Sequence, residues 1–375
     1  MLLWFWLSLQ LAYWAFIFFG IRRFDRLRAA VGGEGGKGGA DLQLVVPAFN
    51  ELRHLPMIEQ KVADAQASDI AAWLVDDGSS DGSSDQLAEL CRDRHARLLR
   101  HAVNRGKAAA LQTGISKVTT PVVLLIDADT IVSTDSVRDV DMAPNVGAVA
   151  FTLAATGNSR LAVMQACEYE YILNFERQAL AGFGIVLTVP GAASLWRIDS
   201  LSAIGGFSAR TEAEDTDATL ALQAAGWQVA VRDIVAHTEC PATLAGLIRQ
   251  RGRWIWGNLQ AARYALVEAY SKASVVTRKP ALAIAMASAL NVLGYGVATM
   301  MIVRVAMLDV GMADLLAAAM LCLATVGRVE VARRLRCLSR RGLIELLANL
   351  FAMQTVNLVA FWHGGLARLL HKRVW

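Results

Sequence analysis

The sequence predicts an α/β protein with a doubly wound, mostly parallel sheet, flanked at both ends of the chain by transmembrane and interfacial helices. Three observations lead to this class. Of the 375 residues, 55% are hydrophobic and only 19% are charged, which is too apolar for an ordinary soluble protein. Long apolar runs stand near both ends of the chain. Between them, short apolar segments alternate with helix-like segments, which is typical of a parallel sheet.

The first element is an apolar run of 20 residues, Leu2–Ile21, long enough as a helix to cross a hydrocarbon core of about 30 Å. Arginines follow this run, and no small-residue cleavage pattern is present, so we expect a retained transmembrane helix over 1–21 rather than a signal peptide. The positive flank predicts that the following domain is cytoplasmic. Residues 22–41 are basic and then glycine-rich, which indicates a linker that becomes a flexible tether over Val31–Ala40.

Residues 42–245 are expected to form the α/β domain. Its predicted strands are short β-branched and apolar runs: Leu42–Val46, Ala72–Val75, Val122–Ile126, Gly147–Phe151, Ile185–Val189 and Val229–Val231. Ligands of open α/β sheets bind beyond the carboxyl ends of the strands, so residues just after these runs are candidates for a site. No Gly-x-Gly-x-x-Gly follows a strand, which disfavours a dinucleotide cofactor.

The C-terminal part is expected to hold interfacial helices over 246–280 and a membrane domain over 281–375. Ala281–Val303 is an apolar run of 23 residues and predicts a span. Met312–Val326 is shorter. Leu343–Trp362 carries a polar stripe, which fits either an interfacial helix or a helix that faces a polar cavity. The sequence therefore leaves two or three spans open. The polar residues of this last run are Glu345, Asn349, Gln354 and Asn357.

Charge and cysteine content exclude several classes of protein. The formal net charge is +4, but the basic residues cluster beside the apolar runs, as expected of membrane boundaries and not of a nucleic-acid surface. The five cysteines include no Cys-x-x-Cys pair, so neither a disulfide framework nor a zinc site is indicated. The histidines lack metal-ligand spacing, and no Gly-x-Ser-x-Gly supports a hydrolase.

Two acidic motifs follow predicted strands. Asp76 and Asp77 enter a turn-rich loop, where they could contact a ligand or simply cap the turn. Asp127 and Asp129, at i and i+2 after an apolar strand, point to one side and can share a hard cation such as Mg²⁺ or Mn²⁺. Bound there, the ion would neutralise charge on a departing diphosphate.

Two further motifs lie on predicted helices. Glu214 and Asp215 open one helix, where acidic residues could be functional or could only complement the helix dipole. Gln250, Arg253 and Trp254 share one helical face, which could serve a site or the membrane surface. A guanidinium, a flat ring and several carboxylates suit a diphosphate, a sugar and a metal ion, so together they predict a sugar-nucleotide site.

Six motifs in this order resemble the inverting, membrane-bound glycosyltransferases of family 2, and most of all the processive branch that makes cellulose, hyaluronan, chitin oligosaccharides and poly-N-acetylglucosamine. The match runs from about Leu42 to Leu259. The motifs are Val45–Glu51, Val75–Asp81, Asn104–Ala108, Ile126–Asp129, Glu214–Asp215 and Gln250–Trp254. The family usually has Thr where this chain has Ala213, which removes a supporting hydroxyl and leaves the carboxylates intact.

The resemblance implies a GT-A-type domain and a role for each motif. The nucleotide pocket would be formed by Pro47, Phe49, Glu51, Asp76 and Asp77, with Lys107 near the donor phosphates. Asp127 would lean toward the nucleotide and Asp129 would be the more direct metal ligand. Asp215 would be the general base. Arg253 would clamp the diphosphate, Gln250 would bind donor phosphate or acceptor, and Trp254 would stack on the acceptor sugar.

The function so implied is elongation of a β-linked oligo- or polysaccharide from a UDP-sugar, UDP-N-acetylglucosamine or UDP-glucose, by a multi-pass protein of the inner (plasma) membrane. The partners would be the donor, a growing glycan or lipid-linked acceptor, membrane lipids, and a second copy or an export partner. One alternative is transfer of a single sugar to a polyprenyl phosphate or other lipid. Another is a non-enzymatic membrane subunit or transporter.

Overall fold

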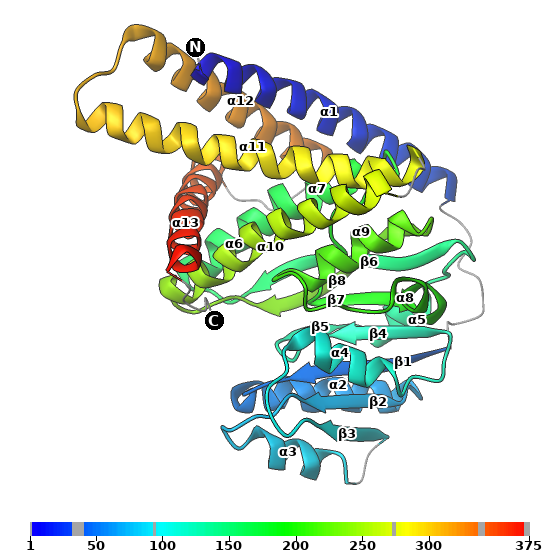
Figure 1. The fold of residues 1–375 in the computed structure, drawn as a ribbon. Helices are drawn as coiled ribbons and strands as arrows, with labels where there is room; N and C mark the ends of the chain where they lie inside the picture. Colours follow the sequence, from blue (N-terminus) through cyan, green and yellow to red (C-terminus); the bar gives the residue numbers. More distant parts are fainter. Residues whose placement is uncertain (1, 32–40, 93–94, 272–274, 337–341, 371–375) are drawn as a thin grey trace.

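A computed structural model describes residues 2–31, 41–92, 95–271, 275–336 and 342–370 (Figure 1). Within these residues, eight strands form one sheet in the order β3-β2-β1-β4-β7-β6-β8-β5. The pairs β3/β2, β2/β1, β1/β4 and β6/β8 are parallel, and the others are antiparallel. The strands are β1 Leu42–Ala48, β2 Ala72–Asp76, β3 Ala96–Arg100, β4 Val122–Ile126, β5 Thr130–Val132, β6 Val146–Thr156, β7 Ala193–Arg197 and β8 Gln228–Glu239.

Helices cover both faces of this sheet, which confirms the doubly wound class. Strand β1 shows why: Leu44 and Val46 point into one buried core and Val45 into the other, so alternate side chains are buried on both sides. The first core contains α2 Leu55–Ala67, α3 Ser83–Leu90 and α5 Thr134–Arg138. The second contains α4 Lys107–Ile115, α8 Ile198–Ile204 and α9 Glu214–Ala224.

One predicted strand is absent. Ile185–Val189 is apolar but lies outside the sheet, and side chains of α9 satisfy its backbone. Val189 N donates to Thr219 Oγ1 at 2.8 Å, and Gln223 bonds both backbone polar groups of Val186. Three strands were missed, β3, β5 and β7, of which β3 and β5 lie at the edges of the sheet. They are short, and Arg97 and Arg100 make β3 look polar.

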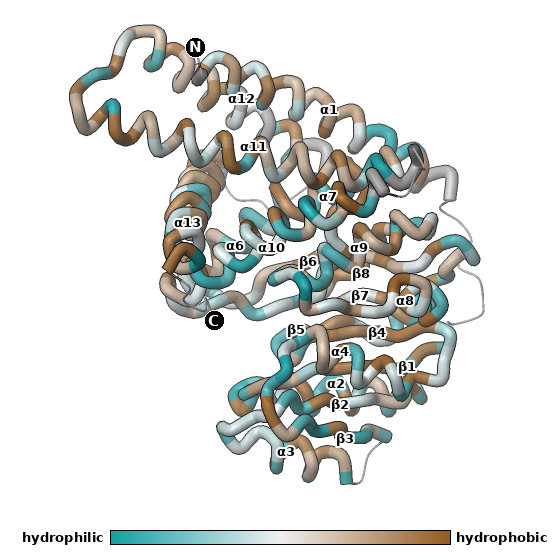
Figure 2. The backbone as a smooth tube through the Cα atoms, viewed as in Figure 1, coloured by the Kyte–Doolittle hydropathy of each residue, from teal (hydrophilic) through white to brown (hydrophobic). Residues whose placement is uncertain are grey.

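Four described helices are long and apolar enough to cross a membrane: α1 Leu2–Val31, α11 Val275–Ala306, α12 Met312–Arg336 and α13 Leu343–Leu369. Figure 2 shows that most of their residues are hydrophobic, and Figure 1 shows α1, α11 and α12 side by side with α13 running across their direction. By length and composition, three such helices therefore follow the α/β domain. All three exceed the predicted spans, because helix continues into their polar flanks.

Helix α1 extends ten residues beyond the predicted end at Ile21, so the linker expected over 22–41 begins as helix. The tether proper, over 32–40, lies outside the described residues. Near Ile21, α1 packs on α7 Phe175–Ala181, where Gly20 and Gly182, the residue after α7, bring the two backbones together. A Cβ at Gly20 would collide with the Ala179 carbonyl, and a Cβ at Gly182 with the Gly20 carbonyl. The close crossing therefore fixes α1 to the α/β domain.

A shared apolar core joins the membrane helices to the α/β domain. It contains Ile17 of α1, Tyr171 and Phe175 of the domain, Val329 of α12 and Leu346 of α13. The domain side is a continuous helical segment made of α6 Arg160–Glu168, a π-helix Tyr169–Asn174 and α7. Below it lies α10 Leu244–Ser271, which covers most of the predicted interfacial region and packs against α9, α11 and α13.

Candidate active site

The first predicted motifs meet at one edge of the sheet. Strands β2, β1 and β4 are parallel neighbours, and Asp77, Phe49 and Asp127 directly follow their carboxyl ends. This is the ligand-binding edge of an open α/β sheet. Pro47 lies inside β1, and the Phe49 ring is exposed. An exposed aromatic ring therefore follows the same edge of the sheet as the aspartate motifs, and its contact with a nucleotide stays a prediction.

Asp76 and Asp77 are both buried and both hold the loops around them. Asp77 accepts hydrogen bonds from the backbone amides of residues 105 and 106 at 3.0 and 2.7 Å, and its Oδ1 lies 2.6 Å from His101 Nδ1. Asp76 Oδ1 accepts from Ser79 N at 3.0 Å. The carboxylates therefore fix the turn after β2 and the loop that leads to Lys107. Their contact with the donor stays a prediction.

Glu51 connects the end of β1 to the Asp-Ala-Asp loop. Its carboxylate bonds His54 Nδ1, and His54 Nε2 lies 3.0 Å from Glu239 Oε2. The backbone amide of Glu239 in turn donates to the Asp129 carbonyl at 3.0 Å. Glu51 therefore acts on the shape of the site through neighbouring loops, besides its predicted place in the nucleotide pocket.

Lys107 joins the donor side to the Glu-Asp motif. Its Nζ lies 2.6 Å from both carboxylate oxygens of Asp127, 3.8 Å from Glu214 Oε1 and 3.3 Å from the Gly191 carbonyl. Desolvation opposes the charged amine, but the charges of Asp127 and Glu214 outweigh it and raise the pKa of Lys107. Desolvation raises the pKa values of the Asp127 and Glu214 carboxyls. Lys107 therefore stays protonated between two carboxylates at the centre of the site.

A buried lysine supports the Asp-Ala-Asp loop from behind. Lys61 is 2% exposed, and its Nζ donates to the carbonyls of Asp127, Ala128 and Thr130 at 3.0, 2.7 and 2.7 Å. Burial lowers the pKa of Lys61 to about 8, although the negative charges of Asp129 and Asp127 oppose this shift. The sequence contained a signal for it, because Lys61 shares the buried face of α2 with Ile58.

The carboxylates fit a metal ion that is shared with a ligand. Among the residues the structure describes, no three His, Cys, Asp or Glu side chains gather to form a metal centre of their own. Mg²⁺, however, commonly binds one or two carboxylates and completes its shell with substrate phosphates and water. Asp127 is already paired with Lys107, whereas Asp129 is partly exposed and, among the residues that the structure describes, its carboxylate accepts only from the Thr130 hydroxyl at 3.1 Å. Asp129 is thus the carboxylate better placed to bind an ion.

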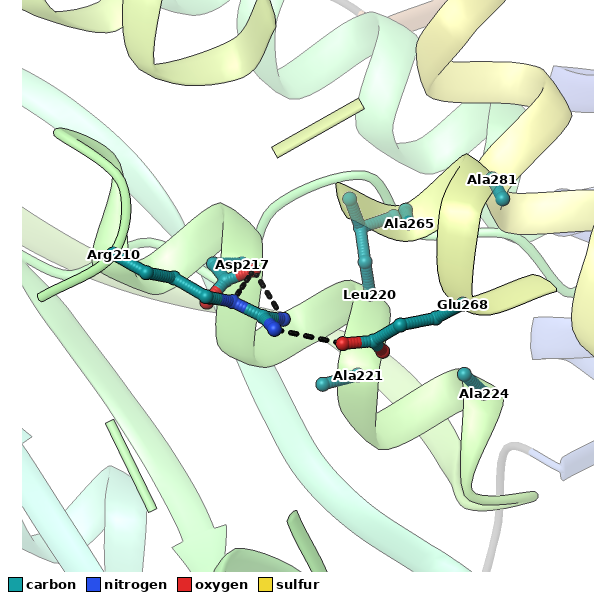
Figure 3. Close-up of a pocket in the computed structure, with 8 residues that line it drawn as sticks. All are labelled: Arg210, Asp217, Leu220, Ala221, Ala224, Ala265, Glu268 and Ala281. Carbon is teal, nitrogen blue, oxygen red and sulfur yellow. Dashed lines mark hydrogen bonds and ion pairs between the residues drawn. The ribbon is translucent and has the colours of Figure 1, made fainter. Parts of the chain in front are cut away.

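Acidic residues of the segment 212–217 pair with basic side chains from separate elements. Glu212 pairs with Arg368 of α13, and Glu214 pairs with Lys107. Asp217 accepts a bidentate bond from Arg210, with contacts of 2.8 to 3.1 Å, and Figure 3 shows Arg210 continuing to Glu268 of α10 at 2.7 Å. The cavity beside this last network is only about 10 Å³, the size of one water, so it is a structural joint and no substrate pocket.

Asp215 differs from these neighbours. Its two oxygens accept from the backbone amides of Gly191 at 3.0 Å and Thr216 at 2.7 Å, and no described residue forms a direct ion pair with it. A Cβ at residue 191 would lie 3.1 Å from Asp215 Oδ2 and 3.2 Å from Lys107 Nζ, so Gly191 permits the close approach. Asp215 is therefore a half-buried carboxylate held in place by backbone amides, and the charges of Lys107 and Arg177 act on it without direct contact.

Helix α10 carries Gln250, Arg253 and Trp254, and the structure places them differently. Trp254 packs on the sheet core, with its ring centroid 6.4 Å from that of Tyr169. Arg253 is exposed, and Gln250 Oε1 accepts from Arg251 Nη1 at 3.3 Å. The same helix holds the acidic segment, because Gly257 packs on Ala213 with no room for a Cβ. The Trp-bearing helix and the Glu-Asp motif thus form one unit.

Two arginines missed by sequence reasoning lie in this region. Arg251 is 2% exposed, pairs with buried Glu168 at 2.6 Å, and places its guanidinium carbon 4.0 Å from the Trp254 ring centroid. Arg177, on α7, donates to the Phe151 carbonyl at 3.3 Å. Burial lowers the pKa of Arg177 to about 10, while the charge of Asp215 opposes this shift. Neither Glu168 nor Arg177 belongs to a sequence motif. Within Gln250–Trp254, the motif pointed to Arg253 and not to Arg251.

Comparison with known proteins identifies the domain. Residues 43–204 match the profile described as "Glycosyl transferase family 2". This part of the chain is a family 2 glycosyltransferase domain. The chain is 26% identical over 235 residues to poly-beta-1,6-N-acetyl-D-glucosamine synthase of Staphylococcus epidermidis, covering 58% of this chain and 54% of that protein. The corresponding Staphylococcus aureus (strain COL) protein is 28% identical over 196 residues, 49% of this chain and 46% of that protein. The chain thus spans about half the length of these relatives.

A solved structure confirms the fold class. The mannosyltransferase PcManGT from Pyrobaculum calidifontis, determined in complex with GDP-Man and Mn²⁺, superimposes with a TM-score of 0.65 at 18% identity, covering 100% of both chains. At that identity the likeness shows the architecture alone. The GT-A-type fold with apolar helices at both ends, predicted from the sequence, is therefore confirmed, and the chain is a membrane protein.

Proposed function

We propose that the protein elongates a β-linked glycan at the membrane by transferring sugar from UDP-N-acetylglucosamine or UDP-glucose to the end of the chain. The observation that carries this proposal is the environment of Asp215. Each other carboxylate of the segment 212–217 has a cationic partner, whereas Asp215 is held by two backbone amides. A fixed, unpaired carboxylate between the strand-end motifs and the Trp254 helix suits a general base.

In this mechanism Asp215 takes the proton of an acceptor hydroxyl as its oxygen attacks the anomeric carbon, and the bond to the nucleoside diphosphate breaks in the same displacement. An α-linked donor then gives a β-linked product without a covalent intermediate on the enzyme. Lys107, protonated between Asp127 and Glu214, supplies positive charge beside the leaving group. A bound Mg²⁺ or Mn²⁺ would neutralise charge on the diphosphate, with Asp129 and Asp127 as its protein ligands.

The residues on the acceptor side favour elongation of a growing chain over transfer of a single sugar. Trp254 is a partly exposed ring whose orientation is fixed by Tyr169 and by the Arg251 guanidinium over one of its faces. A flat ring binds successive sugar units by their faces without demanding one register. The donor motifs would face the cytoplasm, with α1, α11 and α12 crossing the inner membrane, α13 packed against the domain, and the basic residues after Ile21 on the cytoplasmic side.

One experiment tests the proposal. Purified protein in lipid nanodiscs is incubated with UDP-N-acetylglucosamine, UDP-glucose or GDP-mannose and Mg²⁺ or Mn²⁺, and products are sized with Asp215→Asn as the matched control. A polymer ladder from a UDP-sugar, absent in the variant, supports the proposal. A product of one added sugar on lipid extract supports the polyprenyl-phosphate alternative. Absence of transfer with every donor refutes the activity.

A further inference from the structure

Helix α13 is apolar enough to cross a membrane, yet much of it packs on the glycosyltransferase domain. It contacts α10 along its second half and also contacts α6. Trp256 of α10 donates from Nε1 to the Phe361 carbonyl of α13 at 3.1 Å, and the two rings stack with centroids 5.5 Å apart. Gly364 lies against Trp256, where a Cβ would meet the indole at 2.8 Å. This close fit gives α13 a fixed register on α10.

The first polar link from α13 leads to Trp254. Asn357 Nδ2 donates to Glu168 Oε1 at 3.0 Å, and Arg251 Nη2 donates to Glu168 Oε2 at 2.6 Å. Asn357, Glu168 and Arg251 are 8%, 4% and 2% exposed. Because Arg251 also covers the Trp254 ring, Asn357 is connected to the predicted acceptor platform through two buried side chains. Interactions among such desolvated groups are strong and directional.

The second polar link leads to Asp215. Arg368 of α13 pairs with Glu212, and its guanidinium carbon also lies 5.2 Å from the Trp256 ring centroid. Glu212 is held a second time, because its backbone amide donates to Gln260 Oε1 of α10 at 2.9 Å. Glu212 precedes Asp215 by three residues, in the loop that packs on Gly257. The ion pair to α13 is thus one of the contacts that hold this loop, beside those with Gln260 and Gly257, and the loop leads directly to Asp215.

We propose that α13 positions both parts of the acceptor half of the site, Asn357 acting on Trp254 and Arg368 acting on Asp215. The inference rests on the proposed function for the roles of Trp254 and Asp215. Neither α13 residue touches the predicted donor side, so both are positioning residues for the acceptor reaction. The C-terminal membrane helix is then part of the catalytic assembly as well as an anchor.

The two links have different kinetic consequences. Arg368→Gln leaves Glu212 without its cation and loosens the loop, so kcat is expected to fall about tenfold while acceptor KM and UDP affinity hold, since a small misplacement of a catalytic group is costly. Asn357→Ala frees one oxygen of Glu168 and loosens Arg251 and Trp254, so acceptor KM is expected to rise about fivefold with kcat nearly unchanged. Arg368→Lys keeps the charge and is expected to recover most of kcat.

The experiment measures kcat, acceptor KM and UDP affinity for these variants in nanodiscs, with His363→Gln as control because His363 is exposed on the same helix. Amide hydrogen exchange of 210–217 and 250–256 supplies a readout independent of activity. The expected result is increased exchange at 210–217 for Arg368→Gln and at 250–256 for Asn357→Ala, each with its own kinetic effect. The charge-reversed pair Glu212→Arg with Arg368→Glu is expected to exceed either single variant in kcat.

Two results overturn the inference: variants that match His363→Gln in kinetics and exchange, or variants that lose kcat, acceptor affinity and thermal stability together, which would be loss of packing alone. Failure of the proposed function is a separate outcome. If the unmodified protein transfers no sugar, the function is refuted, and the exchange data alone decide whether α13 positions the two segments.

Discussion

The donor and acceptor halves of the site are held by different kinds of interaction. The donor half stands on β2, β1 and β4, and hydrogen bonds between side chains and backbone hold its loops, as at Asp77 and Lys61. In the acceptor half, two backbone amides hold Asp215. Ion pairs and ring contacts between helices hold the rest, as at Glu168, Glu212 and Trp254.

Because of this difference, the apolar helices contact the two halves unequally. The second hydrophobic core includes one residue of α1, but the predicted donor residues make their described contacts inside the α/β domain. Two acceptor-side pairs end instead on α13, at Asn357 and Arg368. We therefore expect detergents that disturb α13 to affect acceptor transfer before UDP binding. The following experiments test whether the two halves can be impaired separately.

The largest expected effect is on the donor half, from removal of the metal ion. Chelation is expected to abolish transfer, because charge stabilisation by a metal contributes several kcal/mol, about 10³ or more in rate. Asp129→Asn should also abolish transfer. The variant should remain inserted in the membrane, since the residue lies outside the apolar helices. Activity is measured against added Mg²⁺ or Mn²⁺ in each protein. Full turnover in excess chelator would contradict the metal role.

The next effect lies in the acceptor half. Asp215→Asn retains the shape of the side chain but cannot take a proton, so transfer is expected to fall on the order of 10² to 10⁴. UDP affinity should stay nearly unchanged, because the Asp215 carboxylate is held by the Gly191 and Thr216 amides and, among the described residues, makes no direct ion pair with Lys107. Calorimetric titration with UDP checks this. A tenfold or greater loss of UDP affinity would place Asp215 in the donor pocket instead.

A smaller loss of activity is expected from Lys61, which supports the donor half. Lys61→Met removes the ammonium that binds three carbonyls of the Asp-Ala-Asp loop, and losses of such supporting contacts typically cost about 10 to 100-fold in metal affinity or activity. The metal concentration for half-maximal activity should rise, with acceptor KM unchanged. Lys117→Met, at an exposed lysine, is the matched control. An unaltered metal requirement would show that the loop holds its shape without Lys61.

The contrast between the halves also explains which features the sequence could predict. Strand-end motifs such as Asp127 and Asp129 are contiguous, and adjacent parallel strands bring them together by the geometry of the sheet. Glu168, Glu212 and Arg368 belong to no motif, and their partners lie 83 or 156 residues away. Nothing local in the sequence marks such pairs, because they form only when helices from separate regions pack.

Local apolar character predicted a strand wrongly where side chains bind the backbone of the segment. Ile185–Val189 has the composition of a strand, but Thr219 and Gln223 capture backbone groups that a strand would pair with a neighbour. Strand β7 was missed although it pairs with both β4 and β6 at the centre of the sheet. The overall class could be predicted because alternating strands and helices leave few arrangements. Individual mixed-sheet strands depend on tertiary contacts.

The smallest expected change, and the most direct comparison of the halves, pairs two adjacent residues of α10. Trp254→Ala removes the ring that Arg251 covers, so products should shorten while UDP affinity holds. Arg253→Ala removes an exposed guanidinium and should weaken UDP binding several-fold with product length little changed, because diphosphate charge is left uncompensated. Product sizing beside UDP titration decides between them. Arg249→Ala, at another exposed arginine of the helix, controls for general loss of charge. If Trp254→Ala stays active and makes products of normal length, the ring is not the acceptor platform, and single addition becomes the better description of the enzyme.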